Sequence, residues 1–125
     1  MFPRVSDYDM IEAVIATTSG GLVGGDQLEV DVSVGRCAQA MVTTQAAEKV
    51  LRSVGPGTCV AVNLRLESGG WLEWMPQETI IFDGARLRRR ITLNVGNGAS
   101  ALAGEIVAFG RSGRGERLTN GLLHD

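Results

Sequence analysis

The strongest constraint on the fold of this chain is the stretch from Gln27 to Val34, QLEVDVSV, in which every second residue is apolar. Successive side chains of a β-strand point to opposite faces, so a period of two predicts a strand with one buried face and one face in water. The same period returns in residues 59–66 (CVAVNLRL) and 85–95 (ARLRRRITLNV), although Arg89 interrupts the apolar face of the second run. Residues 104–111 (GEIVAFGR) form a further β-prone run bounded by glycines. The sequence therefore predicts a chain built mainly from strands.

Glycine-rich stretches separate these runs and predict the turns. Residues 68–70 (SGG) predict a β-hairpin whose second strand begins at Trp71. Residues 83–84 (DG) predict another turn, and residues 43–53 (TTQAAEKVLRS) have a helical composition. Since the chain has 125 residues, 44% of them hydrophobic, we expect a single domain over residues 1–125. We expect that domain to be mainly β and layered, with at most one or two short helices.

Charge and composition exclude several classes of partner. The formal net charge is −2 and the pI is near 5.4, so no positive field favours nucleic acid or an anionic membrane. The N-terminal residues lack the pattern of a signal peptide, and no charge-free stretch is long enough to cross a bilayer, so a cytoplasmic protein is expected. Cys37 and Cys59 show no metal-binding spacing. We interpret them as small buried hydrophobes, with a soft metal ligand as the alternative.

The first alternating run follows the glycine-rich segment TTSGGLVGGD, residues 17–26. This segment lacks the lysine of a phosphate-binding P-loop and leads into a strand instead of a helix. We therefore interpret it as a tight structural turn, which needs backbone conformations that glycine adopts freely. The turn residues are Gly20, Gly21, Gly24, Gly25 and Asp26.

A second glycine motif, residues 95–101 (VGNGASA), fits the GxGxxA variant of the dinucleotide fingerprint at Gly96, Gly98 and Ala101. No second βαβ unit follows, so the sequence favours a plain turn; the alternative is a small β-domain that binds a nucleotide or metabolite there. Residues 110–115 (GRSGRG) do not match GxSxG, and His124 is the sole histidine of the sequence. A Ser/His/Asp catalytic system is therefore not recognisable, and we do not expect an enzyme.

Carboxylates gather in the segment LEWMPQETIIFDG, which contains Glu73, Glu78 and Asp83. Burying a carboxylate without a partner is costly, and the arginines of residues 86–90 lie nearby in the sequence. A structural ion-pair network is the interpretation that the sequence favours. The alternative is a polar path or a site for a hard cation, which the spacing permits.

Four blocks of the sequence carry a resemblance: TTSGGLVGGDQL, VTTQAAEKVLRS, WLEWMPQETIIFDGARLRRR and GEIVAFGRSGRGERLTNGLLHD. In order and spacing they resemble the urease accessory protein family UreD, called UreH in some organisms, and most of all its alphaproteobacterial branch. UreD-like proteins are longer, so the resemblance implies a fragment that lacks the N-terminal strands and the C-terminal half. It also implies stacked strands in a β-helix-like arrangement, incomplete relative to the full family fold.

The resemblance further implies a function as a scaffold and chaperone. Proteins of this kind bind apo-urease and recruit UreF, which docks the GTPase UreG, and nickel passes through the assembly to the urease active site. No permanently bound cofactor is implied, only transient nickel. Such an ion, moving along an internal water-filled route, would use carboxylates as transient ligands. The candidates are Glu78 and Asp83, with Glu73 and Glu105 behind them.

Two further sets of residues have an expected role. Asp26 could line the nickel path, although a role in bracing the turn is favoured. Arg111, Arg114 and Glu116 are expected to hold a loop by ion pairs, with a partner surface as the lesser possibility.

Overall fold

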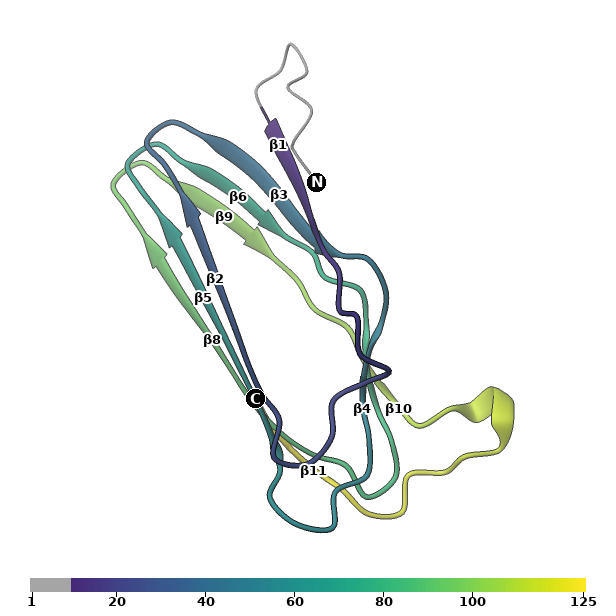
Figure 1. Cartoon of the computed structure of the whole chain (residues 1–125). Coiled ribbons are helices and arrows are strands. Elements are labelled where there is room, and N and C mark those ends of the chain that lie inside the picture. The colour runs from purple at the N-terminus through teal and green to yellow at the C-terminus, as the bar shows by residue number, and fades with distance from the viewer. Residues whose placement is uncertain (1–9) are drawn as a thin grey trace.

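The computed structural model describes residues 10–125, which form strands and one short 3-10 helix, η1 (Ser112–Arg114). The chain winds around the three sides of a prism, so that β2, β3 and β4 lie on three different sides and β5 returns to lie beside β2 (Figure 1). The mainly β, stacked architecture expected from the sequence is confirmed.

Each side of the prism is one sheet. Sheet A contains β1 (Met10–Ile15), β3 (Gln39–Thr44), β6 (Trp71–Trp74) and β9 (Ser100–Ala103), in that order. Sheet B contains β4 (Glu48–Val50), β7 (Thr79–Ile81) and β10 (Val107–Phe109). Sheet C contains β2 (Gln27–Val34), β5 (Thr58–Leu66), β8 (Arg86–Val95) and β11 (Leu122–His124).

All eight pairings between these strands are parallel. Parallel neighbours cannot be joined by a tight turn, so the connection from one strand to its partner passes through the other two sheets. In sheet C, Gln27 lies opposite Cys59, and Cys59 lies opposite Arg88. In this register, outward residues lie beside outward residues and inward residues beside inward residues in neighbouring strands.

The alternating runs predict the inward and outward faces correctly. In β5, Val62, Leu64 and Leu66 are buried, whereas Cys59 and Arg65 are exposed. The larger core lies between sheets A and C and consists of Val34, Val42, Val62, Leu64, Leu66, Leu72 and Trp74. A smaller core lies between sheets B and C and consists of Val50, Ile81, Ala85 and Leu87.

The hairpin predicted at residues 68–70 is wrong. The segment does turn, but β6 pairs with β3 and β9 in sheet A, and β5 stays in sheet C. Equivalent turns stack on one another: Cys37 N–H donates to Ser68 C=O, and Gly69 N–H donates to Asn97 C=O. Each turn includes a residue with positive φ, namely Cys37 (55°), Gly69 (71°) and Gly98 (66°). The glycine signal marks the edge where the chain passes from sheet C to sheet A.

The helix predicted over residues 43–53 is also wrong. This segment contains the end of β3 and the short strand β4, whose Val50 is completely buried against the second core. The three residues of β4 pair in order with the three residues of β7, from Glu48 with Thr79 to Val50 with Ile81. Stacking of β4 on β7 therefore overrides a modest helical propensity.

The last long strand, β8, is covered along a short part of its length. β11 pairs with β8 at Arg86–Arg88, so the remainder of β8 has no neighbour on that side within residues 10–125. Ile91, Leu93 and Val95 have the inward parity of the core residues, yet their side chains are between 38% and 47% exposed. The described part of the chain contains no helix long and apolar enough to cross a membrane.

Candidate functional site: a polar cluster inside the prism

The three sheets border a cavity of about 300 Å³. Its apolar walls come from residues such as Leu28, Val30 and Leu87 of sheet C. Its polar lining residues are Thr17, Thr18, Thr44, Glu48, Gln77, Thr79, Arg89 and Glu105. The interior of the prism is therefore apolar near the larger core and polar toward sheet B.

Arg89 is the charged centre of this polar cluster. It occupies an inward position of β8, two residues after the buried Leu87, and its side chain is 6% exposed. Arg89 Nη1 lies 2.6 Å from Glu105 Oε2, at ion-pair distance but without the alignment of a hydrogen bond. The same nitrogen donates to Thr79 Oγ1 at 3.4 Å. The guanidinium thus supplies the countercharge that burial of Glu105 requires.

A second carboxylate reaches Arg89 from the end of the described chain. Arg89 Nε donates to Asp125 Oδ1 at 2.9 Å, and Arg89 Nη2 contacts Asp125 Oδ2 in the same bidentate pair. The hydrogen bonds from Arg89 lower the pKa of the Asp125 carboxyl, and the same bonds raise the pKa of Arg89 against the opposing effect of burial. Both groups are therefore charged at neutral pH.

Trp74 fixes the remaining oxygen of Glu105. Its indole Nε1–H donates to Glu105 Oε1 at 3.1 Å, and the ring belongs to the larger core. Nearby, Thr17 Oγ1–H donates to Glu48 Oε2 at 3.1 Å. Two carboxylates from different strands and loops, Glu105 and Glu48, therefore line one cavity.

Of the four predicted nickel-path carboxylates, Glu105 lines the cavity. Glu73 lies on the outer face of β6, where it accepts a hydrogen bond from Trp71 Nε1 at 3.2 Å. Glu78 lies at the start of sheet B, where its backbone carbonyl accepts a hydrogen bond from Glu48 N–H, and it is not a lining residue of the cavity. Their role toward nickel stays a prediction.

Asp83 lies on the outside of the prism and holds a loop. Its Oδ1 accepts hydrogen bonds from Thr119 N–H (2.6 Å), Thr119 Oγ1–H (2.9 Å) and Asn120 N–H (3.0 Å). These donors lower the pKa of the Asp83 carboxyl, and the Thr119 backbone amide has the largest effect. Asp83 therefore tethers the segment that leads from η1 to β11 (Figure 1).

Within residues 10–125, no group of three or more His, Cys, Asp or Glu side chains is placed to hold a metal ion. Cys37 and Cys59 are both exposed, so their interpretation as buried hydrophobes is wrong. Cys59 has the outward parity of β5, and Cys37 lies in the turn that leads to sheet A. The ion-pair network predicted between Glu73, Glu78, Asp83 and the arginines of residues 86–90 is wrong in its carboxylates. Among the described side chains, Arg89 pairs instead with Glu105 and Asp125.

The glycine-rich segment before β2 passes from sheet A to sheet C. Gly21 (φ 145°) and Gly25 (φ 92°) have positive φ, and a Cβ atom at Gly24 would lie 2.2 Å from Ser53 Oγ. Asp26 Oδ2 accepts a hydrogen bond from Val23 N–H at 2.8 Å. Gly20 is exposed, and a Cβ atom there would meet no other group within 4 Å.

The nucleotide fingerprint lacks the structure that its chemistry needs. Residues 96–99 make a tight turn closed by a hydrogen bond from Ala99 N–H to Gly96 C=O, and the chain continues into strand β9. A phosphate would require a helix N-terminus at this point. The structure therefore favours the plain turn.

The loop after β10 is held differently from our expectation. No ion pair joins Arg111, Arg114 and Glu116 among the described side chains. Arg111 instead lies over the ring of Phe82, with its guanidinium carbon 5.5 Å from the ring centroid, a cation–π contact.

Trp74, Glu48 and Asp125 are the residues of the cluster that sequence reasoning did not assign, and Arg89 was assigned only to an ion-pair network with other carboxylates. For Arg89 a signal was present, since a charged residue at an inward position of an alternating strand must have a partner inside the fold. For Trp74 the local sequence carries no such signal, because the partner Glu105 is 31 residues away.

A stack of parallel strands wound around a partly polar interior places this chain among the β-helix-like proteins. The model of one protein family, the UreD urease accessory protein, matches residues 1–125 of the chain. The chain belongs to the UreD urease accessory protein family.

Curated relatives agree with this assignment. The urease accessory protein UreD of Magnetococcus marinus is 50% identical over 100% of this chain and 43% of its own length. UreD 1 of Methylobacterium radiotolerans is 47% identical over 92% of this chain and 40% of its own length. UreD of Rhodopseudomonas palustris is 47% identical over 92% of this chain and 41% of its own length. The chain thus spans less than half the length of the relatives that it matches.

Proposed function

We propose that this chain acts in urease maturation, as part of a scaffold that binds apo-urease together with UreF and the GTPase UreG during nickel insertion. The observation that carries the proposal is the family match over residues 1–125, supported by 50% identity to a urease accessory protein. The family description is that of an accessory protein, which suggests a non-catalytic role.

The cavity supports a more specific proposal for nickel. Ni²⁺ is a borderline ion that accepts oxygen and nitrogen ligands, and Glu105 and Glu48 bring carboxylates to the cavity. Glu105 is already paired with Arg89, so a passing nickel ion would compete with the guanidinium for this carboxylate. Such competition favours transient contact over permanent binding, as cargo transfer requires.

The first experiment is co-expression of the chain with apo-urease, a UreF-like protein and a UreG-like protein from the same source. Size-exclusion chromatography and the nickel content of the recovered urease are the two measurements. We expect the chain to co-elute with the partners and the nickel content to rise above that of a co-expression without the chain. A chain that elutes alone and leaves the nickel content unchanged would contradict the proposal.

Two variants test the route through the interior. Glu105→Gln retains the size and the hydrogen bond with Trp74 but removes the charge, so we expect a several-fold loss of nickel in urease with partner binding retained. Glu12→Gln is the matched control, since Glu12 is an exposed carboxylate of β1 that does not line the cavity. Equal losses in both variants would exclude the cavity as the route, and a joint loss of partner binding would indicate damage to folding.

A further inference from the structure

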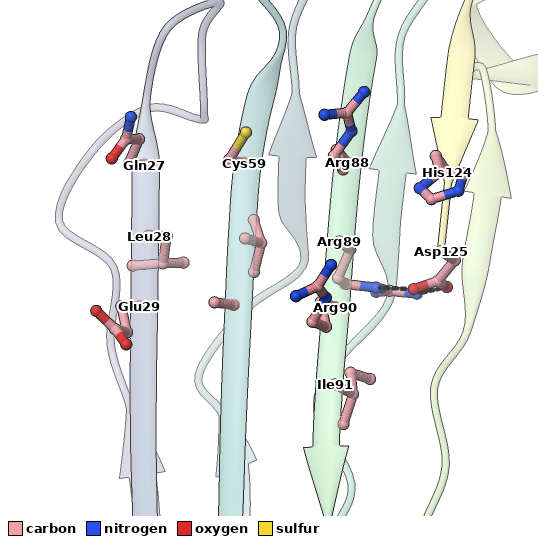
Figure 2. A pocket seen from close by; sticks show the side chains of 12 residues that line it. Gln27, Leu28, Glu29, Cys59, Arg88, Arg89, Arg90, Ile91, His124 and Asp125 are labelled. Carbon is pink, nitrogen blue, oxygen red and sulfur yellow. Dashed lines mark hydrogen bonds and ion pairs between the residues drawn. The ribbon is translucent and has the colours of Figure 1, made fainter.

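The outer face of sheet C contains a groove on the opposite side of the sheet from the interior cavity; Leu28, Val60 and Arg89 line both. The groove has a volume of about 690 Å³ and lies over β5 and β8, between β2 and the end of β11 (Figure 2). Gln27, Cys59, Arg88 and His124 form one row across it, because they lie opposite one another in the parallel register. The lining thus crosses neighbouring strands, and above β5 the outward side chains of β2 and β8 stand on either side.

The wall on the β8 side is basic. Arg86, Arg88 and Arg90 are exposed at alternate positions, so they form a file with a spacing of about 7 Å, twice the rise per residue of a strand. Arg86 Nη1 donates to Gly55 C=O at 3.3 Å. Within residues 10–125, Arg88 and Arg90 take part in no ion pair. Two guanidinium groups, those of Arg88 and Arg90, thus line the groove (Figure 2).

The wall on the β2 side is acidic. Glu29 lines the groove, and Asp31 follows two residues further along β2, just beyond the lining; both carboxylates are exposed. Asn63 Nδ2 donates to Glu29 Oε1 at 3.3 Å and to Asp31 Oδ1 at 3.0 Å, which holds both carboxylates at the edge of β5. The acidic wall is therefore fixed in place by the sheet itself.

The floor of the groove is low because β5 presents small side chains there, Cys59 and Ala61. The two walls stand two strand spacings apart, about 10 Å, which is room for one extended polypeptide. A chain lying flat over β5 would direct successive side chains alternately toward one wall and toward the other.

We propose that this groove binds an extended polypeptide segment of a partner protein in which acidic and basic residues alternate. Its acidic side chains would pair with Arg88 and Arg90, and its basic side chains with Glu29 and Asp31. Guanidinium groups bind carboxylates bidentately, and the repeat of about 7 Å along both walls equals that of alternate residues in an extended chain. This function is independent of nickel transfer through the interior.

A purely anionic partner satisfies the structure less well. Such a partner would leave the Glu29 and Asp31 carboxylates unpaired. It would also bring its own negative charges close to these two carboxylates, which is unfavourable. The complementary walls instead select a segment that carries both charges.

The test uses a labelled, end-capped peptide of about eight alternating Glu and Lys residues, which spans roughly 26 Å when extended. Fluorescence anisotropy with the full chain measures its Kd at low and at high ionic strength. We expect saturable binding that weakens with salt, since both walls are exposed. Peptides of Glu alone and of the same composition in two charge blocks should bind at least about tenfold more weakly, a difference of about 1.4 kcal/mol.

Variants of the walls locate the binding. The double variants Arg88→Glu with Arg90→Glu, and Glu29→Lys with Asp31→Lys, should each weaken binding at least about tenfold. Combining all four changes exchanges the walls, and binding should recover because the peptide can bind in the opposite direction. Arg65→Glu, on the same face but outside the groove, is the matched control and should leave Kd unchanged. Unchanged circular dichroism spectra confirm that the variants fold.

Three results would overturn the proposal. The first is no binding of the alternating peptide. The second is equal binding of the Glu peptide, which would assign the arginines to a simple anion site. The third is equal loss of binding in Arg65→Glu, which would indicate attraction to the whole face.

Discussion

The two interior regions of the prism, one between sheets A and C and one between sheets B and C, are built on opposite principles. The first is bounded in sheet C by long strands such as β5 and β8, and its core consists of seven buried apolar residues. The second is closed by the three-residue strands of sheet B, and it places the Arg89 cluster beside a core of four buried residues.

The difference shows how a stacked fold accommodates a polar interior. Apolar burial stabilises the first region in proportion to the area removed from water. A buried ion pair adds little net stability relative to apolar packing, although removal of one partner is strongly destabilising. The first region therefore carries the stability of the fold, and the second carries the chemical groups that the proposed function uses.

The largest effect is expected from a cavity in the first region. Leu64 is completely buried, so Leu64→Ala should lower the free energy of unfolding by about 3–5 kcal/mol. Urea unfolding followed by circular dichroism measures the loss. Leu102→Ala is the control, because Leu102 is 52% exposed and should change stability by less than about 1 kcal/mol. Equal effects at both positions would show that the first region is not the stabilising core.

The second region can be broken by removal of its central charge. Arg89→Ala leaves Glu105 buried without a countercharge and should lower the free energy of unfolding by about 3 kcal/mol. This value is the lower end of the range for removal of one partner of a buried ion pair, because the other partner, Asp125, is partly exposed. The double variant Arg89→Leu with Glu105→Leu should recover most of this loss in the same urea experiment. A double variant as unstable as Arg89→Ala would show that the ion pair itself stabilises the fold.

A smaller effect is expected outside both regions, at the loop held by Asp83. The pKa of Asp83 is lowered in the folded chain, so its contribution is present above pH about 4 and is lost as the pH falls through the folded value. Asp83→Ala should remove this part of the acid sensitivity of the melting temperature. It should also speed tryptic cleavage at Arg111, Arg114 or Arg117 at neutral pH. Thr92→Ala, on the outer face of β8, is the control; unchanged cleavage in Asp83→Ala would exclude the tether.

The smallest effect concerns the stacked turns that border the first region. Cys37 has φ of 55°, whereas glycines occupy the equivalent positions above it. Cys37→Gly should relieve strain of about 1 kcal/mol and raise the melting temperature by a few degrees. Gly69→Ala should do the reverse, since φ is 71° and the new Cβ would lie 3.1 Å from Cys37 Sγ. A lower melting temperature for Cys37→Gly would contradict the strain.

The sequence predicts the first region well and the second poorly, for physical reasons. Alternation reports directly which side chains of β2 and β5 face inward, because the period of two is a local property of a strand. It does not report which strand lies alongside, so residues 68–70 predict a turn correctly and a hairpin wrongly. In sheet B the strands are three residues long, too short for a period to be visible.

The candidate site depends even more on distant contacts. Glu105 meets Trp74 and Arg89 through stacking of rungs that are far apart in the sequence. The family resemblance identifies Glu105 as a candidate, but its position inside the prism and those of Glu73 and Asp83 outside it are properties of the assembled stack.

The parallel stacking has a consequence for the order in which the chain can fold. Paired strands begin between 28 residues apart, as for Val107 and Thr79, and 36 residues apart, as for Leu122 and Arg86. A strand cannot pair with the next strand of its sheet until one more turn of the chain around the prism has left the ribosome. Synthesis of that turn takes a few seconds at typical rates. Folding should therefore be slow and advance from the N-terminal rungs, and each newly made rung exposes an unpaired edge until its successor arrives.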